Sequence, residues 1–96
     1  MKKVFIKEIN ENDKVESIFL VKQKSISFTK AGTPYLNLTL IDKTGEVNGK
    51  VWEQAEKLAK LFQKDDFIKI KSTAVTYQNS LQLNISSIIP LSPSEI

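Results

Sequence analysis

The chain has 96 residues, the size of one small domain with a single hydrophobic core. It contains no cysteine, which excludes a disulfide framework and a Cys-based zinc site. It also contains no histidine, which removes the usual general base near neutral pH and the commonest metal ligand. We therefore expect no catalytic residue, no metal site and no cofactor in this chain.

The formal charge is +3 and the isoelectric point is near 9.2, with every positive side chain a lysine. A mildly basic balance favours a polyanionic partner. Lysine suits contact with phosphates but lacks the guanidinium fork that reads guanine, so we expect contact with a nucleic-acid backbone rather than sequence-specific readout. No apolar run is long enough for a membrane span or a secretory signal. The expected location is the cytoplasm, without membrane contact.

The first part of the chain predicts an arm and one long strand. Residues 1–9 mix lysines with apolar residues and are expected to form a short extended arm or edge strand, followed by a polar loop over 10–13. Residues 14–27 alternate and carry apolar side chains on both faces, which predicts a strand shared by two sheets and curling between them. One face holds Val15, Ser17, Phe19 and Val21, and the other holds Ile18 and Leu20.

A hairpin follows the loop at 28–34. Residues 35–40 alternate strictly, with leucines on one face and Tyr, Asn and Thr on the other, which predicts a half-buried strand. Residues 42–45 suit a tight turn, and Asp42 is interpreted as a turn residue rather than a metal ligand. The second strand places Val47, Gly49 and Val51 inward, and Glu46, Asn48 and Lys50 outward. The outer face of this hairpin suits stacking a base and holding a phosphate.

The second half predicts one helix and two strands. Apolar residues at helical spacing predict a helix over 53–62. Strict alternation would place Trp52 outward, but the turn into this helix is expected to swing the indole under the barrel, against Leu58 and Phe62. A strand over 67–77, a turn at 78–80 and a fifth strand follow. Their inward residues are Ile68, Ile70, Ser72 and Ala74, then Leu81, Leu83 and Ile85, with Ile88 and Ile89 extending the core.

Five strands with one helix between the third and the fourth give the order of the OB-fold, an all-β, five-stranded Greek-key barrel whose open bottom the helix covers. The small residues Ser17, Gly49 and Ser72 lie on inward faces, where strongly bent strands need room. We expect this domain to span residues 1–89. Residues 90–96 are rich in Pro and Ser and are expected to form a linker towards a further domain.

The stretch over 34–47 resembles the hydrophobic-x-Leu-x-Asp-x-x-Gly-x-Val signature of nucleic-acid-binding OB-folds, among them the anticodon-binding domains of class II aminoacyl-tRNA synthetases. The segments Gly-Lys-Val-Trp at 49–52 and Asp-Asp-Phe-Ile-Lys-Ile-Lys at 65–71 are most similar to the N-terminal OB domain of bacterial HD-domain 3′-to-5′ exoribonucleases of the YhaM type. This resemblance covers roughly residues 8–89. It implies that catalysis belongs to an HD phosphohydrolase domain outside this chain.

The same resemblance implies which side chains bind. Aligned on the Asp and Gly of the signature, Asn37 and Asn48 occupy the positions that contact bases in the anticodon-binding relatives. Asn37 stands where those relatives often carry a stacking aromatic, so we expect Tyr35, on the same face, to take over the stacking. The remaining candidates are lysines that would follow phosphates and residues of the last hairpin, which borders the groove in OB-folds. They are Lys22, Lys24, Lys43, Lys50, Tyr77 and Asn79.

These observations predict a module that binds single-stranded nucleic acid, with RNA favoured over DNA, for a catalytic domain encoded beyond Ile96. One alternative is an OB domain that docks a protein partner through the same hairpin, its lysines serving solubility. A free-standing enzyme is disfavoured because the chain lacks His and Cys.

Overall fold

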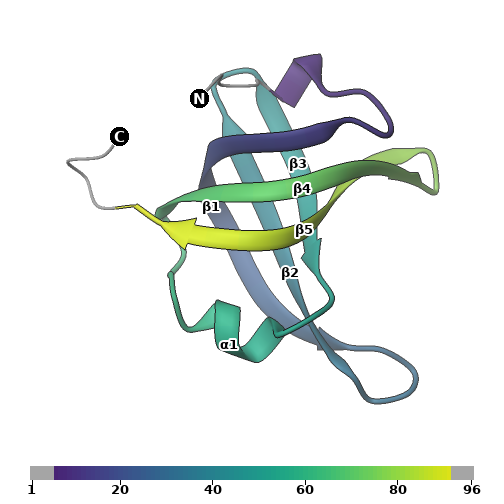
Figure 1. The fold of residues 1–96 in the computed structure, drawn as a ribbon, viewed down its shortest axis with the longest axis vertical. Helices are drawn as coiled ribbons and strands as arrows, with labels where there is room; N and C mark the ends of the chain where they lie inside the picture. Colours follow the sequence, from purple (N-terminus) through teal and green to yellow (C-terminus); the bar gives the residue numbers. More distant parts are fainter. Residues whose placement is uncertain (1–5, 92–96) are drawn as a thin grey trace.

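The computed structural model describes residues 6–91. They form a closed barrel in which the strands follow the order β1-β2-β3-β5-β4 (Figure 1). Neighbouring strands are antiparallel except β3 and β5, which are parallel. This confirms the predicted all-β OB-fold with one helix between the third and fourth strands. The elements are η1 (Ile6–Glu8), β1 (Lys14–Phe28), β2 (Pro34–Asp42), β3 (Gly45–Val51), α1 (Ala55–Ala59), β4 (Phe67–Tyr77) and β5 (Ser80–Pro90).

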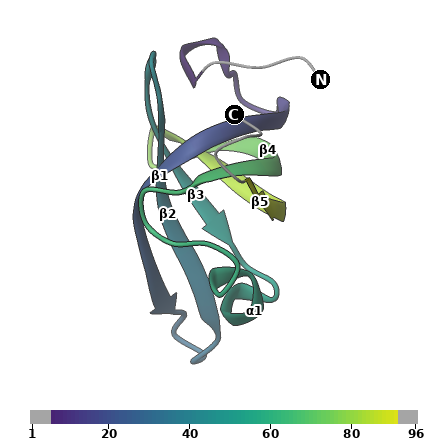
Figure 2. The same ribbon diagram turned by 90° about the vertical axis from the view of Figure 1, so that its left-hand side faces the viewer.

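Strand β1 belongs to both sides of the barrel, as predicted. Its first half pairs with β4, from Lys14 to Leu20, and its second half pairs with β2, from Leu20 to Phe28. An irregularity between Val21 and Gln23 separates the two halves and gives the strand its bend. The end of β1, the start of β2 and the loop that joins them lie at the same end of the molecule as α1 (Figure 2).

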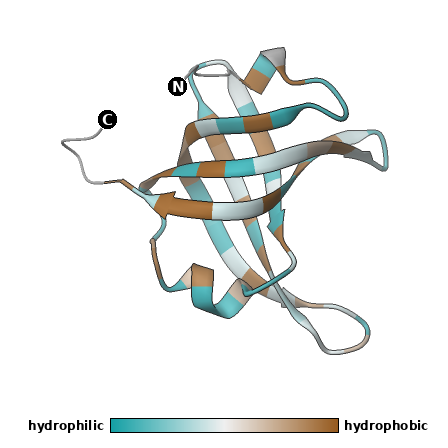
Figure 3. Ribbon diagram, viewed as in Figure 1, coloured by the Kyte–Doolittle hydropathy of each residue, from teal (hydrophilic) through white to brown (hydrophobic). Residues whose placement is uncertain are grey.

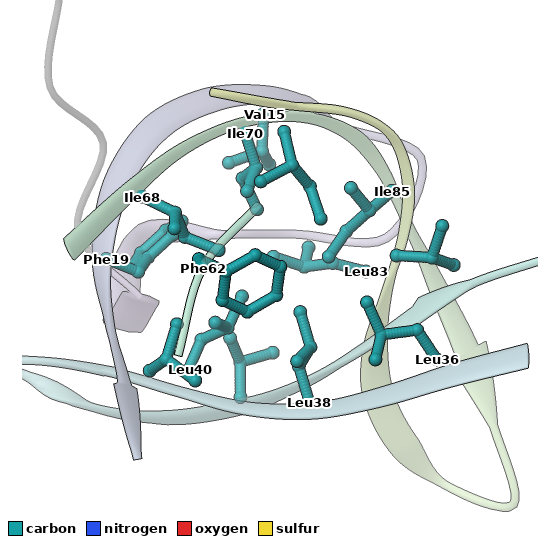
Figure 4. Packing of buried hydrophobic residues seen from close by; sticks show 14 of the residues in the cluster. Val15, Phe19, Leu36, Leu38, Leu40, Phe62, Ile68, Ile70, Leu83 and Ile85 are labelled. Carbon is teal, nitrogen blue, oxygen red and sulfur yellow. The ribbon is translucent and has the colours of Figure 1, made fainter. Parts of the chain in front are cut away.

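The interior is filled by alternate residues of every strand, and hydrophobic and hydrophilic bands alternate along the ribbon (Figure 3). Phe62 lies in the middle of this cluster and is almost fully buried (Figure 4). Burying a side chain of that size stabilises the fold by about 1.5–3 kcal/mol. The small Ser17 and Ser72 are also buried on inward faces, as predicted, and Ser72 Oγ donates to the Val15 carbonyl at 3.2 Å.

The helix is shorter than predicted. It covers 55–59 rather than 53–62, because Gln54 adopts a left-handed conformation with φ of 57° and the helix begins only after it. At the other end, the Leu61 amide donates to the Leu58 carbonyl, a tight turn that releases Phe62 into the core. Among residues 6–91, no helix is long and apolar enough to cross a membrane.

The prediction of an extended N-terminal arm is wrong for the part that the structure describes, and residues 1–5 lie outside that part. η1 is a 3₁₀ turn, in which residues three apart share one side, so that Ile6 and Ile9 are both buried. Asp42 fixes this turn, since its Oδ2 accepts the Ile6 amide at 2.7 Å and its Oδ1 accepts the Thr44 amide at 2.7 Å. Burial would raise the pKa of Asp42, but hydrogen bonds from Thr44, Ile6 and Gly45 lower it overall.

The end of β5 differs from the prediction at one residue. Ile88 is buried and extends the core, whereas Ile89 is 49% exposed. A second irregularity explains this, because β4 advances from Lys71 to Ser72 while β5 moves from Ser87 to Ile85. The skipped residue shifts the alternation, so that Ile85 and Ile88 both face inward.

Barrel closure between β3 and β5 depends on Gly49. The two strands pair there, with Gly49 opposite Leu83. A Cβ on Gly49 would lie 2.8 Å from Ile85 Cδ1 and 3.3 Å from Leu40 Cδ1. The absence of a side chain therefore lets the inner layers of β2 and β5 meet over β3.

We predict that Gly49→Ala destabilises the domain by about 1–3 kcal/mol, the usual cost of overpacking a filled core. The measurement is the midpoint of urea unfolding. Ile85→Val removes the Cδ1 atom that the new methyl would meet, so the double variant should be more stable than the sum of the two single effects predicts. Strict additivity of the two effects would contradict the packing argument.

Candidate nucleic-acid interface

The outer faces of β2 and β3 carry a hydrogen-bonded polar cluster. Asn37 Oδ1 accepts from both Asn48 Nδ2 and Lys50 Nζ, at 2.9 Å each. Asn48 Nδ2 also donates to the Leu38 carbonyl at 3.1 Å. The register places Asn37 directly opposite Lys50, so the lysine reaches across one strand spacing. Three of the predicted binding residues therefore meet on one surface and hold each other in place.

An aromatic pair adjoins this cluster. The ring centres of Tyr35 and Trp52 lie 4.7 Å apart with the planes tilted by 32°, and Lys50 Nζ lies 5.5 Å from the centre of the Tyr35 ring. Trp52 is 45% exposed, and its Nε1 donates to Asn84 Oδ1 at 3.2 Å. The prediction that Trp52 packs under the barrel is wrong. The alternation of β3 continues one residue past its end, and the chain turns towards α1 only at Gln54.

The β4–β5 hairpin brings a third aromatic ring to the same place. Its turn residues, Gln78 and Asn79, both have positive φ, which suits a two-residue hairpin turn. Tyr77, just before the turn, is 62% exposed. A hollow of about 230 Å³ opens here, which we call the aromatic hollow. It is lined by Tyr35, Lys50, Trp52, Tyr77 and Gln82.

The aromatic hollow is one end of a groove along β3. A second hollow, of about 290 Å³, shares Lys50, Tyr77 and Gln82 with it. A third, of about 460 Å³, shares Asn48 with the second and reaches Glu46. The strand from Trp52 to Glu46 spans about 20 Å, so the groove is long enough for more than one nucleotide. Within residues 6–91, no group of three or more acidic side chains could hold a metal ion.

The other predicted lysines lie outside the aromatic hollow. Lys24 Nζ donates to the carbonyls of Ala59 and Phe62, where it caps the last turn of α1. Lys22 forms an ion pair with Glu46 at 2.9 Å, at the far end of the groove. Lys43 lies in the β2–β3 turn, one residue beyond the last pair, Asp42 with Gly45, which is itself five pairs or about 17 Å from the Asn37–Lys50 pair.

Asn79 lies at the exposed tip of the β4–β5 turn, two residues beyond Tyr77. Of the nine side chains predicted to bind, Tyr35, Asn37, Asn48, Lys50 and Tyr77 are therefore gathered around the groove.

Sequence reasoning missed Gln82 and Asn84 as well as the exposure of Trp52. Both amides face outward on β5 and line up with the β3 cluster, Gln82 opposite Asn48 and Asn84 opposite Lys50. The alternation of leucine with Gln and Asn in this strand was the available signal. Its meaning depended on the parallel pairing of β5 with β3, which the alternation itself does not specify.

Residues 20–91 match the sequence model of the OB-fold nucleic acid binding domain family. The chain belongs to this family. Similar solved structures include the replication factor A related protein from Methanobacterium thermoautotrophicum, at 22% identity and a TM-score of 0.77, covering 96% of this chain and 93% of that one. The second OB-fold domain of replication protein A from Methanococcus maripaludis has 20% identity and a TM-score of 0.74, covering 95% and 96%.

A third similar structure is Rim1, a mitochondrial single-stranded DNA binding protein from S. cerevisiae. It has 13% identity and a TM-score of 0.69, and the match covers 86% of this OB-fold chain and 98% of that protein. At these identities the three structures show that the fold is shared.

We predict that Lys24→Met destabilises this OB-fold domain by about 1–2 kcal/mol, because the carbonyl of Ala59 at the end of α1 and that of Phe62 in the following turn lose a charged donor. The midpoint of thermal unfolding measures the effect. Lys30→Met, at an exposed position in the β1–β2 loop, is the matched control and should leave the midpoint nearly unchanged. Equal effects of the two substitutions would show that Lys24 does not cap the helix.

Proposed function

We propose that this domain binds single-stranded nucleic acid in the groove along β3. The observation that carries the proposal is the Tyr35–Trp52 pair, in which Trp52 is exposed and Tyr35 half-buried, with the Lys50 ammonium close to the Tyr35 ring. Single-strand-binding surfaces combine such aromatic platforms with positive charge along a groove. The family and the folds of the similar structures support this assignment.

The chemistry of the groove divides between bases and phosphates. A base stacked on an exposed ring is worth about 1–3 kcal/mol, and Tyr77 offers a further ring across the aromatic hollow. Lys50 keeps its ammonium over the Tyr35 ring, within reach of the phosphate that precedes or follows a base stacked in the hollow. The amides of Asn37 and Asn48 add hydrogen-bonding groups along the same surface.

We further propose that the ligand is RNA and that the domain presents it to a catalytic HD phosphohydrolase domain of the same protein. This proposal is supported by the resemblance of the segments 49–52 and 65–71 to the N-terminal OB domain of YhaM-type exoribonucleases. Sequencing the gene beyond the codon for Ile96 tests it. A His…His-Asp…Asp pattern downstream would support the HD partner, and a stop codon or an unrelated domain would overturn it.

We predict that binding of a labelled oligonucleotide weakens linearly on a log–log plot against salt, with a slope of roughly −0.7 for each phosphate contacted. Lys50→Met should make that slope less steep by about the contribution of one phosphate contact. Fluorescence anisotropy at four or five salt concentrations gives both values.

Lys64→Met is the matched control for that experiment. Lys64 is exposed in the loop before β4, and the following residues of this loop pair with Val21 of β1, two strands away from β3. Its substitution should leave the slope nearly unchanged. A wild-type domain that shows no binding even at low salt would overturn the proposed function and favour an OB domain that docks a protein partner.

We also predict that oligonucleotide strongly quenches the single tryptophan, because Trp52 is exposed and stands at the edge of the aromatic hollow. The free protein should emit at long wavelength, as expected for an indole in contact with water.

Tyr35→Leu should reduce affinity by about 1–3 kcal/mol while the salt slope stays the same, since it removes a stacking surface and no charge.

Tyr77→Leu offers a comparison on the other side of the hollow. If Tyr77 stacks on the ligand, its substitution should weaken binding without changing the emission of the free protein, because its ring forms no pair with Trp52 in the structure. Emission that does not respond to an oligonucleotide that does bind would contradict the placement of the ligand on Trp52.

A further inference from the structure

The side-chain amide of Gln82 is held in one orientation by a chain of hydrogen bonds. The indole Nε1 of Trp52 can only donate, so the Asn84 atom 3.2 Å away must be the oxygen. That same Oδ1 accepts from Gln82 Nε2, also at 3.2 Å. The amino end of the Gln82 amide is therefore directed at Asn84. The carbonyl oxygen of Gln82 is the end of the amide that does not contact Asn84.

The carbonyl oxygen of Gln82 is available to a ligand. It accepts no hydrogen bond from the residues that the structure describes, because the bond to Asn84 is made by Nε2. Gln82 lines both the aromatic hollow and the adjoining hollow. A base that stacks on Trp52 or Tyr77 would thus meet a hydrogen-bond acceptor in the wall of its site. One of the two N–H groups of the Gln82 amino end is already used by Asn84, and that bond fixes which end of the amide is the acceptor.

We propose that Gln82 is a specificity-determining residue that favours a base with an exocyclic amino group, so that the groove prefers cytosine to thymine or uracil. This inference rests on the proposed function. Cytosine carries an amino donor at C4, where thymine carries a carbonyl oxygen. The amino group can donate to Gln82 Oε1, but a carbonyl there would place two acceptors face to face.

Asn84 and Trp52 act as positioning residues in this arrangement. A free glutamine amide can rotate and offer either its donor or its acceptor, so it would accept cytosine and thymine alike. The indole of Trp52 removes that freedom through Asn84. Removing Asn84 should therefore abolish the preference while leaving the stacking surfaces in place.

The test compares oligo(C) with oligo(U) RNA of equal length at one fixed salt concentration, by fluorescence anisotropy. Wild-type protein should bind oligo(C) about 3- to 10-fold more tightly, the range expected from one hydrogen bond gained or lost. Gln82→Leu and Asn84→Ala should each bring the ratio close to one. Gln82→Glu, whose two terminal oxygens both accept, should weaken binding of both oligonucleotides but keep the preference.

Each outcome distinguishes the inference from the proposed function. Tight binding of both oligonucleotides with equal affinity, or a preference that survives Gln82→Leu, would overturn the role of Gln82 and leave the binding function intact. Failure of both to bind would overturn the function itself. If Gln82→Leu does not fold, the ratio measured for Asn84→Ala decides.

Discussion

The close approach of β3 to β5 at Gly49 is the constraint on which both the barrel and its outer surface depend. Inside, it lets Ile85 and Leu40 meet over the glycine and completes the core. Outside, it places the side-chain amides of Gln82 and Asn84 beside the polar cluster of β3, so that Trp52 Nε1 can donate a hydrogen bond to Asn84. Without this parallel pairing, the aromatic hollow would lack one of its walls. The pairing of β3 with β5 therefore determines both the fold and the proposed binding surface.

The hydrogen bonds around the groove are already formed in the free protein. Asn37 holds Asn48 and Lys50, and Asn84 holds Trp52. A surface arranged in advance loses less side-chain freedom on binding, so more of the interaction with a ligand is retained as affinity. This arrangement compensates in part for a short groove with few lysines, because each ring and each charge starts close to the position in which it would act.

The roles of Lys22 and Lys24 illustrate how one backbone irregularity separates similar residues. Both lie near the bend of β1, and simple alternation would place them on the same face. In the structure, Lys22 pairs with Glu46 on the outer surface of β3, and Lys24 caps the end of α1. The same helix end is short of donors because the last carbonyls of any helix lack partners within it. Lys24 is therefore best understood as part of the fold.

The sequence was sufficient for the strands, their inward residues and the meeting of Tyr35, Asn37 and Lys50, because strict alternation determines which side chains share a face. It was insufficient wherever the backbone departs from regular geometry. Ile89 and Lys24 were misplaced because each follows an irregularity in its strand. Trp52 was misplaced because the alternation of β3 extends one residue past the strand, and the chain turns towards α1 only at Gln54.

The place of the β5 amides in the groove could not be predicted from local alternation. Gln82 and Asn84 are ordinary outward polar residues in their own strand. They become part of the groove through a neighbour 34 residues earlier in the chain, as the pairing of Asn48 with Gln82 shows. Such long-range pairing is specified by the whole topology and not by local pattern.

The order of strands around the barrel also bears on how quickly the domain can form. The hairpins β2–β3 and β4–β5 close over short turns, but β1 must find β4, and Lys14 meets Thr73 across 59 residues. Closing such long loops has an entropic cost that is recovered only when the distant contacts are made, and β-barrels of this kind typically fold in milliseconds to seconds. The two hairpins can therefore exist before the groove does. The groove itself, which spans β2, β3 and the β4–β5 hairpin, can be completed only when the barrel closes, so a nascent or partly folded chain would have its rings and lysines but no assembled surface.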